Sequence, residues 1–225
     1  QARQPSPDAA RRAAQVLSAL GRLLEDPVID VVVEAAEDLG NLGVPESGPV
    51  LTGLLGHPGE SVRKAAAQAL ERVAQPSALD KILRGLDDPS GAVRFSLVGA
   101  IGNMASSAAA PLGAVDLTRV LARLEVTLLK DTDPTVRARA ASALGECGPP
   151  SLLPVMWRAC QPGEDVRVQE KAWLGMIDML ARSRQAPLVA EWNRTLAEAR
   201  QGARQMQLLV DVPVSYTHLR AHETE

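Results

Sequence analysis

The sequence predicts an all-α protein built as a stack of similar helical hairpins, an α-solenoid, and three observations lead to this prediction. A short phrase, Val-Arg followed by alanine or leucine and then Ala-Leu-Gly, recurs with a period near 31 residues. Aromatic residues make up only 2% of a chain that is 46% hydrophobic, so small aliphatic side chains must form the core. No alternating run of strand-forming residues is present, which leaves helices as the repeating element.

The repeated phrase marks the second helix of each predicted hairpin. Its anchor valines lie 31, 31, 43 and 30 residues apart, at Val31, Val62, Val93, Val136 and Val166. Apolar residues at +4, +7 and +8 from an anchor fall on one face of a helix with 3.6 residues per turn. Glycine follows this stripe at Gly40, Gly102, Gly145 and Gly175. We expect these glycines to allow close helix contact or helix termination.

Proline turns precede the second helices, and they set the expected boundaries of the repeats. The hairpins are predicted at about 8–43, 46–74, 77–104, 115–147 and 151–182. A polar-faced capping helix is expected at 187–209, which completes one domain over 1–210. The longer interval before Val136 indicates an insertion of about twelve residues, with its loop at 105–113.

The last stretch, 214–225, does not follow the repeat and holds the only tyrosine and two of the three histidines. It resembles the translated adapter sequence that recurs at the ends of unrelated sequencing-derived proteins. We therefore expect 214–225 to be a non-native, disordered tail. Because the chain also starts at Gln1 and not at methionine, we expect it to be a fragment of a longer protein.

Composition and motifs disfavour several classes of function. The net charge of −3, from 24 basic and 27 acidic residues, argues against a nucleic-acid surface. No run of 18 apolar residues and no secretory signal occur, so we expect no membrane span and a cytoplasmic location. Cys147 and Cys160 are expected to be free thiols, since a helix of roughly 15 Å separates them.

Catalytic chemistry is poorly supported by the sequence. It contains no Cys-x-x-Cys, no phosphate-binding loop and no Gly-x-Ser-x-Gly. The one His-Glu pair, His222-Glu223, lies in the suspect tail, and neither cysteine has a histidine near it in sequence. We therefore expect no catalytic residue, no metal, no cofactor and no small-molecule ligand.

Pro-x-x-x-Val-Arg followed by Ala and Ala-Leu-Gly resembles the HEAT repeat, particularly the short bacterial form also found in phycobilisome lyases. The resemblance covers about residues 26–182. It implies a right-handed superhelix of hairpins whose second helices line the inner, concave side. It also implies that arginines of the phrase form a ladder of bonds between neighbouring repeats. These arginines are Arg63, Arg94, Arg137 and Arg167. The first repeat departs from the pattern with Val32 in place of arginine, and the last with Glu170 at +4.

The repeated arginines have two interpretations. They bind phosphate or carboxylate groups of a ligand along a groove, or they only join repeats by bonding to turn acids such as Asp88 and Asp133. The second interpretation is favoured.

A candidate binding surface follows from positions +3, +6 and +10 of the second helices, which the frame places on the exposed side. This surface is polar and mixed in charge, which favours a protein partner over nucleic acid. The frame also places Ala65, Ser96 and Gly99 there. The candidate binding residues are Glu34, Glu37, Gln68, Arg72, Asn103, Arg139, Glu146 and Gln169.

The sequence thus predicts a non-catalytic scaffold or regulatory module that binds another protein through the concave face of the solenoid. Two alternatives stay open. A chromophore-lyase-like enzyme would copurify with a pigment or transfer a bilin to a partner. A HEAT-like nucleic-acid-binding protein would be retained on DNA at moderate salt and released steeply as salt rises.

Overall fold

The computed structural model describes residues 7–73, 75–107 and 111–183 of the chain. Within these residues the chain forms ten α-helices and three short 3₁₀ helices, and no strand. The capping helix expected at 187–209 and the tail at 214–225 lie outside the described residues. None of the helices in the described part combines the length and the apolar character that crossing a membrane requires.

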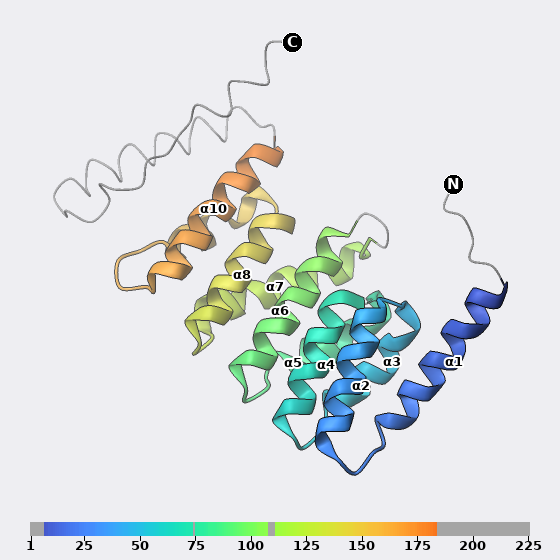
Figure 1. Ribbon diagram of the computed structural model, residues 1–225. Helices are drawn as coiled ribbons and strands as arrows, with labels where there is room; N and C mark the ends of the chain where they lie inside the picture. The colour runs from blue at the N-terminus through green and yellow to red at the C-terminus, as the bar shows by residue number, and fades with distance from the viewer. Residues whose placement is uncertain (1–6, 74, 108–110, 184–225) are drawn as a thin grey trace. The chain divides into compact units, whose positions relative to one another are not determined.

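The ten helices pair into five hairpins (Figure 1), which confirms the prediction of an all-α solenoid. The first helices are α1 (Pro7–Leu23), α3 (Gly48–Leu54), α5 (Leu79–Gly85), α7 (Ala114–Lys130) and α9 (Leu153–Ala159). The second helices are α2 (Ile29–Leu42), α4 (Glu60–Val73), α6 (Gly91–Ser106), α8 (Pro134–Cys147) and α10 (Val166–Ser183). Each second helix packs on its own first helix and on the neighbouring second helices, so the second helices form one continuous layer.

Three of the short first helices begin with a 3₁₀ turn that starts at a proline. These turns are Pro45–Ser47, Pro76–Ala78 and Pro150–Leu152. Proline suits this place because its fixed φ fits the first turn and its missing N–H leaves no donor unsatisfied. Helix α7 has no such turn and is 17 residues long, against 7 for α5. Much of the insertion that the sequence assigned to a loop at 105–113 therefore lengthens α7.

Alanine and glycine set the close spacing of the second helices. The apolar positions of the phrase are fully buried in α4, α6 and α8, including Val62, Leu70, Val93, Leu97, Val136 and Leu144. A methyl group added at Gly40 would lie 2.7 Å from the Cα of Ala69 on the next second helix, where no atom fits. The glycine at +9 of one helix thus meets the +7 residue of the next.

The same +9 to +7 rule corrects the frame of the last repeat. Val166, the predicted anchor, is 75% exposed and Leu174 is 46% exposed, whereas Val168 is fully buried. Gly175, at +7 from Val168, packs against Gly145 of α8, and a Cβ built on Gly175 would lie 3.0 Å from the Gly145 Cα. The anchor is therefore Val168. The sequence prediction was wrong by two residues because Val-Arg happens to precede the true valine directly.

Candidate functional site

Arginines at position +1 join successive turns along one edge of the stack, and we call this set of bonds the turn ladder. The Nε of Arg63 donates to Asp88 Oδ2 at 2.7 Å and its Nη2 donates to Oδ1 at 3.2 Å. Arg94 repeats the arrangement one repeat later, with Nε and Nη2 donating to the two oxygens of Asp131 at 2.8 and 2.7 Å. Such two-pronged bonds between guanidinium and carboxylate are among the strongest polar contacts in proteins.

Each ladder arginine also closes the turn before its own helix. Arg63 Nη1 donates to the carbonyl oxygens of His57 and Pro58 at 3.1 and 3.0 Å, and Arg94 does the same one repeat later. The carboxylate partner is fixed from its own side as well, because Asp88 accepts the Ser90 amide at 2.8 Å. The donors of these arginines are therefore engaged by the protein itself.

The electrostatics of Asp88 follow from this geometry. Its side chain is only 7% exposed. Burial acts to raise the pKa of Asp88, but hydrogen bonds from Arg63 and the Ser90 amide, together with the charges of Arg63 and Arg94, lower the pKa below its usual range. The carboxylate therefore stays ionised at neutral pH.

The ladder weakens toward the C-terminal hairpin. Arg137 reaches Glu164 through Nη2 alone, at 2.6 Å, and its buried Nε has no hydrogen-bond partner in the described part of the chain. Arg167 does not join the ladder as expected, because it bonds Asp165 of its own turn and is 58% exposed. With Val168 as anchor, the ladder position falls on Gln169, which donates to the Gln161 carbonyl at 2.8 Å.

One further prediction about the turn edge needs correction, and one departure from the repeat that the sequence showed gains a structural counterpart. Asp133, an expected partner for the arginines, instead caps α8 by accepting the Thr135 amide at 2.8 Å, and Asp131 takes the ladder bond. In the first repeat, Val32 stands where the others have arginine, and His57 stands where the next turn has aspartate. The arginine and the aspartate that would join the first two repeats are therefore both absent, replaced by Val32 and His57.

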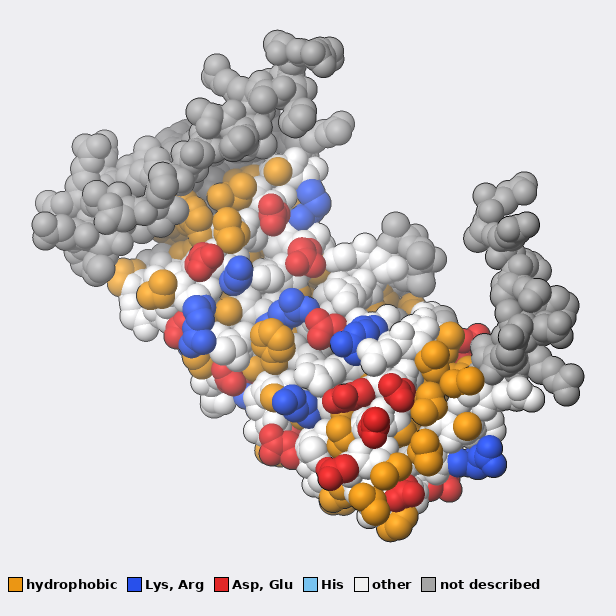
Figure 2. Space-filling view, viewed as in Figure 1, with side chains coloured by type: hydrophobic (Ala, Val, Ile, Leu, Met, Phe, Trp, Pro, Cys, Tyr) orange, Lys and Arg blue, Asp and Glu red, His pale blue; other side chains and the backbone are white. Residues whose placement is uncertain are grey.

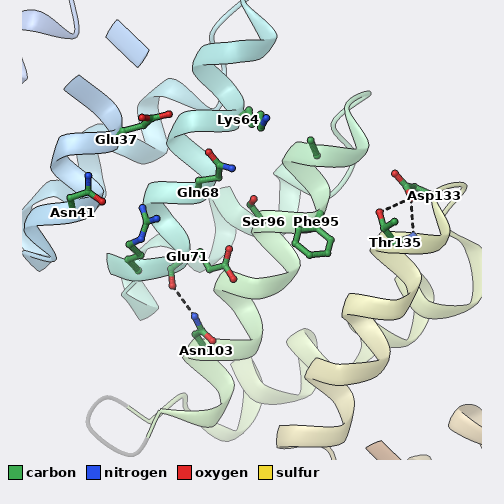
Figure 3. Close-up of a pocket in the computed structure, with 12 residues that line it drawn as sticks. Glu37, Asn41, Lys64, Gln68, Glu71, Phe95, Ser96, Asn103, Asp133 and Thr135 are labelled. Atoms are coloured by element: carbon green, nitrogen blue, oxygen red, sulfur yellow. Dashed lines mark hydrogen bonds between the residues drawn. The ribbon is translucent and has the colours of Figure 1, made fainter. Parts of the chain in front are cut away.

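The second helices carry a groove on their open side, with a volume of about 1030 Å³. It runs over α2, α4 and α6 and reaches the start of α8 (Figure 3). The lining residues are Glu37, Asn41, Lys64, Gln68, Glu71, Arg72, Ala92, Phe95, Ser96, Asn103, Asp133 and Thr135.

The structure brings several of the predicted binding residues together at this groove and leaves others outside it. Glu37, Gln68, Arg72 and Asn103 line it. Glu34 is exposed on α2, one turn before Glu37. Arg139 projects from α8 and contacts two of the lining side chains. Glu146 is exposed at the end of α8 and does not line the groove, and Gln169 belongs to the turn edge.

Three residues that the frame placed on the exposed side are buried: Ala65, Ser96 and Gly99. A central second helix is flanked by a neighbour on both sides, so position +3 of α4 and α6 turns toward a neighbour and only a narrow ridge remains open. Gly99, at +6 of α6, is covered by the Glu71 carboxylate. On α4 this ridge consists of Lys64, Gln68 and Arg72, which lie four residues apart and so line one face of the helix. Lys64 could have been predicted as a member of this ridge, because it lies four residues before Gln68.

Glu71 is the most informative residue that sequence reasoning missed. It occupies position +9, which is glycine in the neighbouring repeats at Gly40 and Gly102. Its carboxylate lies over Gly99 of α6, where an added Cβ would sit 2.6 Å from the Glu71 Cδ. From there it forms an ion pair with Arg139 of α8. The pair joins second helices two repeats apart, whereas most contacts in a solenoid join immediate neighbours.

Phe95 and Asn103 complete this cluster. The guanidinium carbon of Arg139 lies 5.4 Å from the centre of the Phe95 ring, a cation–π distance. Phe95 is 37% exposed, which is unusual for an aromatic side chain in this chain of few aromatics. Asn103 donates to the Glu71 carbonyl at 2.8 Å, the bond drawn in Figure 3.

Charged side chains around the groove are arranged by helix, and those that line it on α2 and α4, apart from Glu71, lack partners among the described residues. Helix α2 has four acidic residues and no basic one. Figure 2 shows this face, with acidic side chains gathered over α2 and lysine and arginine side chains over the helices that follow. Within the described residues, the side chains of Glu34, Glu37, Lys64, Gln68 and Arg72 form no hydrogen bond or ion pair. They are therefore free to bond a ligand.

Among the described residues, the side chains that could carry metal or nucleophile chemistry are not arranged for it. No group of three His, Cys, Asp or Glu residues in the described part of the chain is placed to hold a metal ion. Both cysteines are free thiols. Burial raises the pKa of Cys147 to about 11 and that of Cys160 to about 12, so both thiols are protonated at neutral pH.

Comparisons with solved structures agree with this architecture. A designed armadillo repeat protein in complex with the peptide (KR)4 is 22% identical, with a TM-score of 0.56 over 76% of this chain and 84% of that one. Another designed armadillo repeat protein is 22% identical, with a TM-score of 0.53 over 76% of this chain and 85% of that one. An engineered protein solved by crystallography is 20% identical, with a TM-score of 0.59 over 87% and 92% of the two chains.

Sequence comparisons identify the family. No curated protein sequence matches the chain. The family model of HEAT repeats matches residues 1–71, 17–102 and 54–119. These matches overlap and together cover more than half of the 225 residues. The chain belongs to the HEAT-repeat family.

Proposed function

We propose that this protein is a non-catalytic scaffold or regulatory module that binds a segment of another protein in the groove over α2, α4 and α6. One observation carries the proposal: Glu37, Lys64, Gln68 and Arg72 line a groove on a packed layer of helices and have no partners among the described residues. Water satisfies these side chains in the free protein, so they contribute little to the fold and keep their hydrogen-bonding capacity for a ligand.

Two further observations support a protein segment as the ligand. The similar designed armadillo repeat protein was solved with the peptide (KR)4, and the groove here runs across the same kind of helix layer. The unpartnered groove charges are of both signs, whereas nucleic-acid sites are predominantly basic. The groove offers no observation that favours a chromophore-lyase-like activity.

Selection of peptides from a random library on the purified protein tests this proposal. Gln68 lies at the middle of the groove, so Gln68→Trp should fill it and weaken the selected peptides at least about tenfold in fluorescence anisotropy. Arg84→Trp, at an exposed position on first helix α5, is the matched control and should leave affinity unchanged. Failure to select any peptide, or equal binding by the Gln68→Trp protein, would overturn the proposal, provided that its thermal unfolding is unchanged.

A further inference from the structure

The open ridges of three adjacent second helices differ in chemistry, and their order is fixed by the fold. Helix α2 presents an acidic ridge, Glu34 and Glu37. Helix α4 presents a basic ridge, Lys64 and Arg72. Helix α6 presents Phe95, an exposed aromatic ring. A ligand that crosses the helices from α2 to α6 therefore meets acid, base and ring in that order (Figures 2 and 3).

The ion pair between Glu71 and Arg139 removes two charges from the groove and so simplifies the order of charges that a ligand meets. Glu71 is the acidic side chain nearest to Arg139, and the ion pair between them neutralises both charges. Asp133, a third acid of the lining, lies at the start of α8 and caps that helix. Across α2, α4 and α6, the unpaired charges of the groove are thus the acidic ridge on α2 and the basic ridge on α4.

We propose that the ligand is an extended segment that presents a cationic, then an acidic, then an apolar side chain along the direction from α2 to α6. This inference rests on the proposed function and names the chemistry of the partner. Packed helix axes lie about 8–10 Å apart. An extended chain in the polyproline II conformation advances about 3.1 Å per residue and presents every third side chain on the same face. The three side chains are therefore expected about three residues apart in the ligand.

Electrostatic complementarity makes the proposal selective. A segment of uniform positive charge meets the basic ridge on α4 with like charges, and a segment of uniform negative charge meets the acidic ridge on α2 in the same way. Juxtaposed like charges reduce affinity strongly. Mixed segments in the stated order avoid both conflicts and also bury an apolar side chain against Phe95 and Arg139.

Charge reversal on both partners tests the order. The probes are synthetic peptides with lysine, glutamate and leucine three residues apart, in both chain directions, and the all-lysine and all-glutamate versions. The mixed peptide in one direction should bind best. Changing Glu34→Lys together with Glu37→Lys should weaken it about tenfold or more, and replacing the peptide lysine by glutamate should restore affinity. Changing Lys64→Glu together with Arg72→Glu should also weaken the mixed peptide, and replacing the peptide glutamate by lysine should restore its affinity.

Matched controls reverse equal numbers of exposed charges away from the groove. These are Glu25→Lys with Glu46→Lys and Arg84→Glu with Lys130→Glu, and neither pair should change affinity. The inference is overturned if a uniformly charged peptide binds as tightly as the mixed one, or if the reversals do not exchange peptide preference. If Gln68→Trp weakens the library-selected peptides but their sequences do not show this order of charges, the binding function stands and the inference fails. If no peptide needs Gln68, both fail.

Discussion

The turn ladder and the groove are built from the same helices and the same kinds of charged residue, yet their side chains are used differently. Along the turns, Arg63 and Arg94 are largely buried, and each bonds two turns. Across the groove, Lys64 and Arg72 are exposed and bond nothing among the described residues. The comparison teaches that one edge bonds neighbouring repeats together, while the other face keeps charged side chains unpaired among the described residues, as the proposed binding function requires.

Removal of the most buried rung should have the largest effect on stability. Arg94→Ala leaves the Asp131 carboxylate, whose side chain is 8% exposed, without its cation. Breaking a buried pair in this way costs about 3 kcal/mol in the free energy of unfolding. Urea unfolding followed by circular dichroism measures the loss.

Arg167→Ala is the matched control for that experiment. Arg167 pairs only within its own turn and is mostly exposed, so its removal should leave the urea midpoint unchanged. A loss of stability as large as that of Arg94→Ala would show that exposed pairs hold the stack equally well, against the proposed role of the ladder.

Acid should weaken the ladder next, through Asp88. Its pKa is lowered in the folded state, so its contribution to stability is present above the unfolded pKa of about 3.9 and is lost as pH falls through the lower folded value. Asp88→Asn should therefore cost about 2 kcal/mol at pH 7. The difference from wild type should shrink steadily below about pH 4. A constant difference between pH 6 and pH 2 would contradict the assignment.

A smaller effect on stability is expected at Gly99, which lies under Glu71, the one residue of the central second helices that replaces the glycine at position +9. Gly99→Ala displaces the Glu71 carboxylate and breaks its pair with Arg139, which offsets the better helix propensity of alanine. In a Glu71→Ala background the same change should stabilise by about 1 kcal/mol. The double-mutant cycle of Gly99→Ala and Glu71→Ala should therefore give a coupling energy near 1 kcal/mol. If the two changes in the free energy of unfolding are additive, the small side chain at Gly99 is not needed to accommodate the Glu71 carboxylate.

Sequence periodicity was sufficient to predict the solenoid, because a repeated apolar stripe allows few arrangements of helices. It placed Glu37, Gln68, Arg72 and Asn103 on the open side of the second helices, where the structure shows them lining the groove. It failed at Ser96 and Gly99, because flanking neighbours bury sides of a helix that would be open on its own. The sequence also does not show which of two nearby acids a side chain bonds, so only the structure shows that Arg94 pairs with Asp131 and not with Asp133.

Glu71 and Arg167 show two further limits of the sequence. Glu71 was detectable as a departure from glycine at +9, but its partner on α8 lies 68 residues away and follows no repeat. The sequence Val166-Arg167-Val168 of the last hairpin allowed two frames, and the burial of Val168 together with the contact between Gly145 and Gly175 selects the second. Local patterns identify helices, whereas contacts across repeats decide which residue is free.

The division between a stabilising edge and a binding face is tested most directly by neutralising the groove while measuring stability. The variant carries Glu37→Gln, Lys64→Gln and Arg72→Gln, and the comparison variant carries Arg63→Gln and Arg94→Gln. The groove variant should keep its free energy of unfolding in urea within about 0.5 kcal/mol of wild type, whereas the ladder variant should lose several kcal/mol. If the groove variant loses as much as the ladder variant, its side chains hold the fold and the account is wrong.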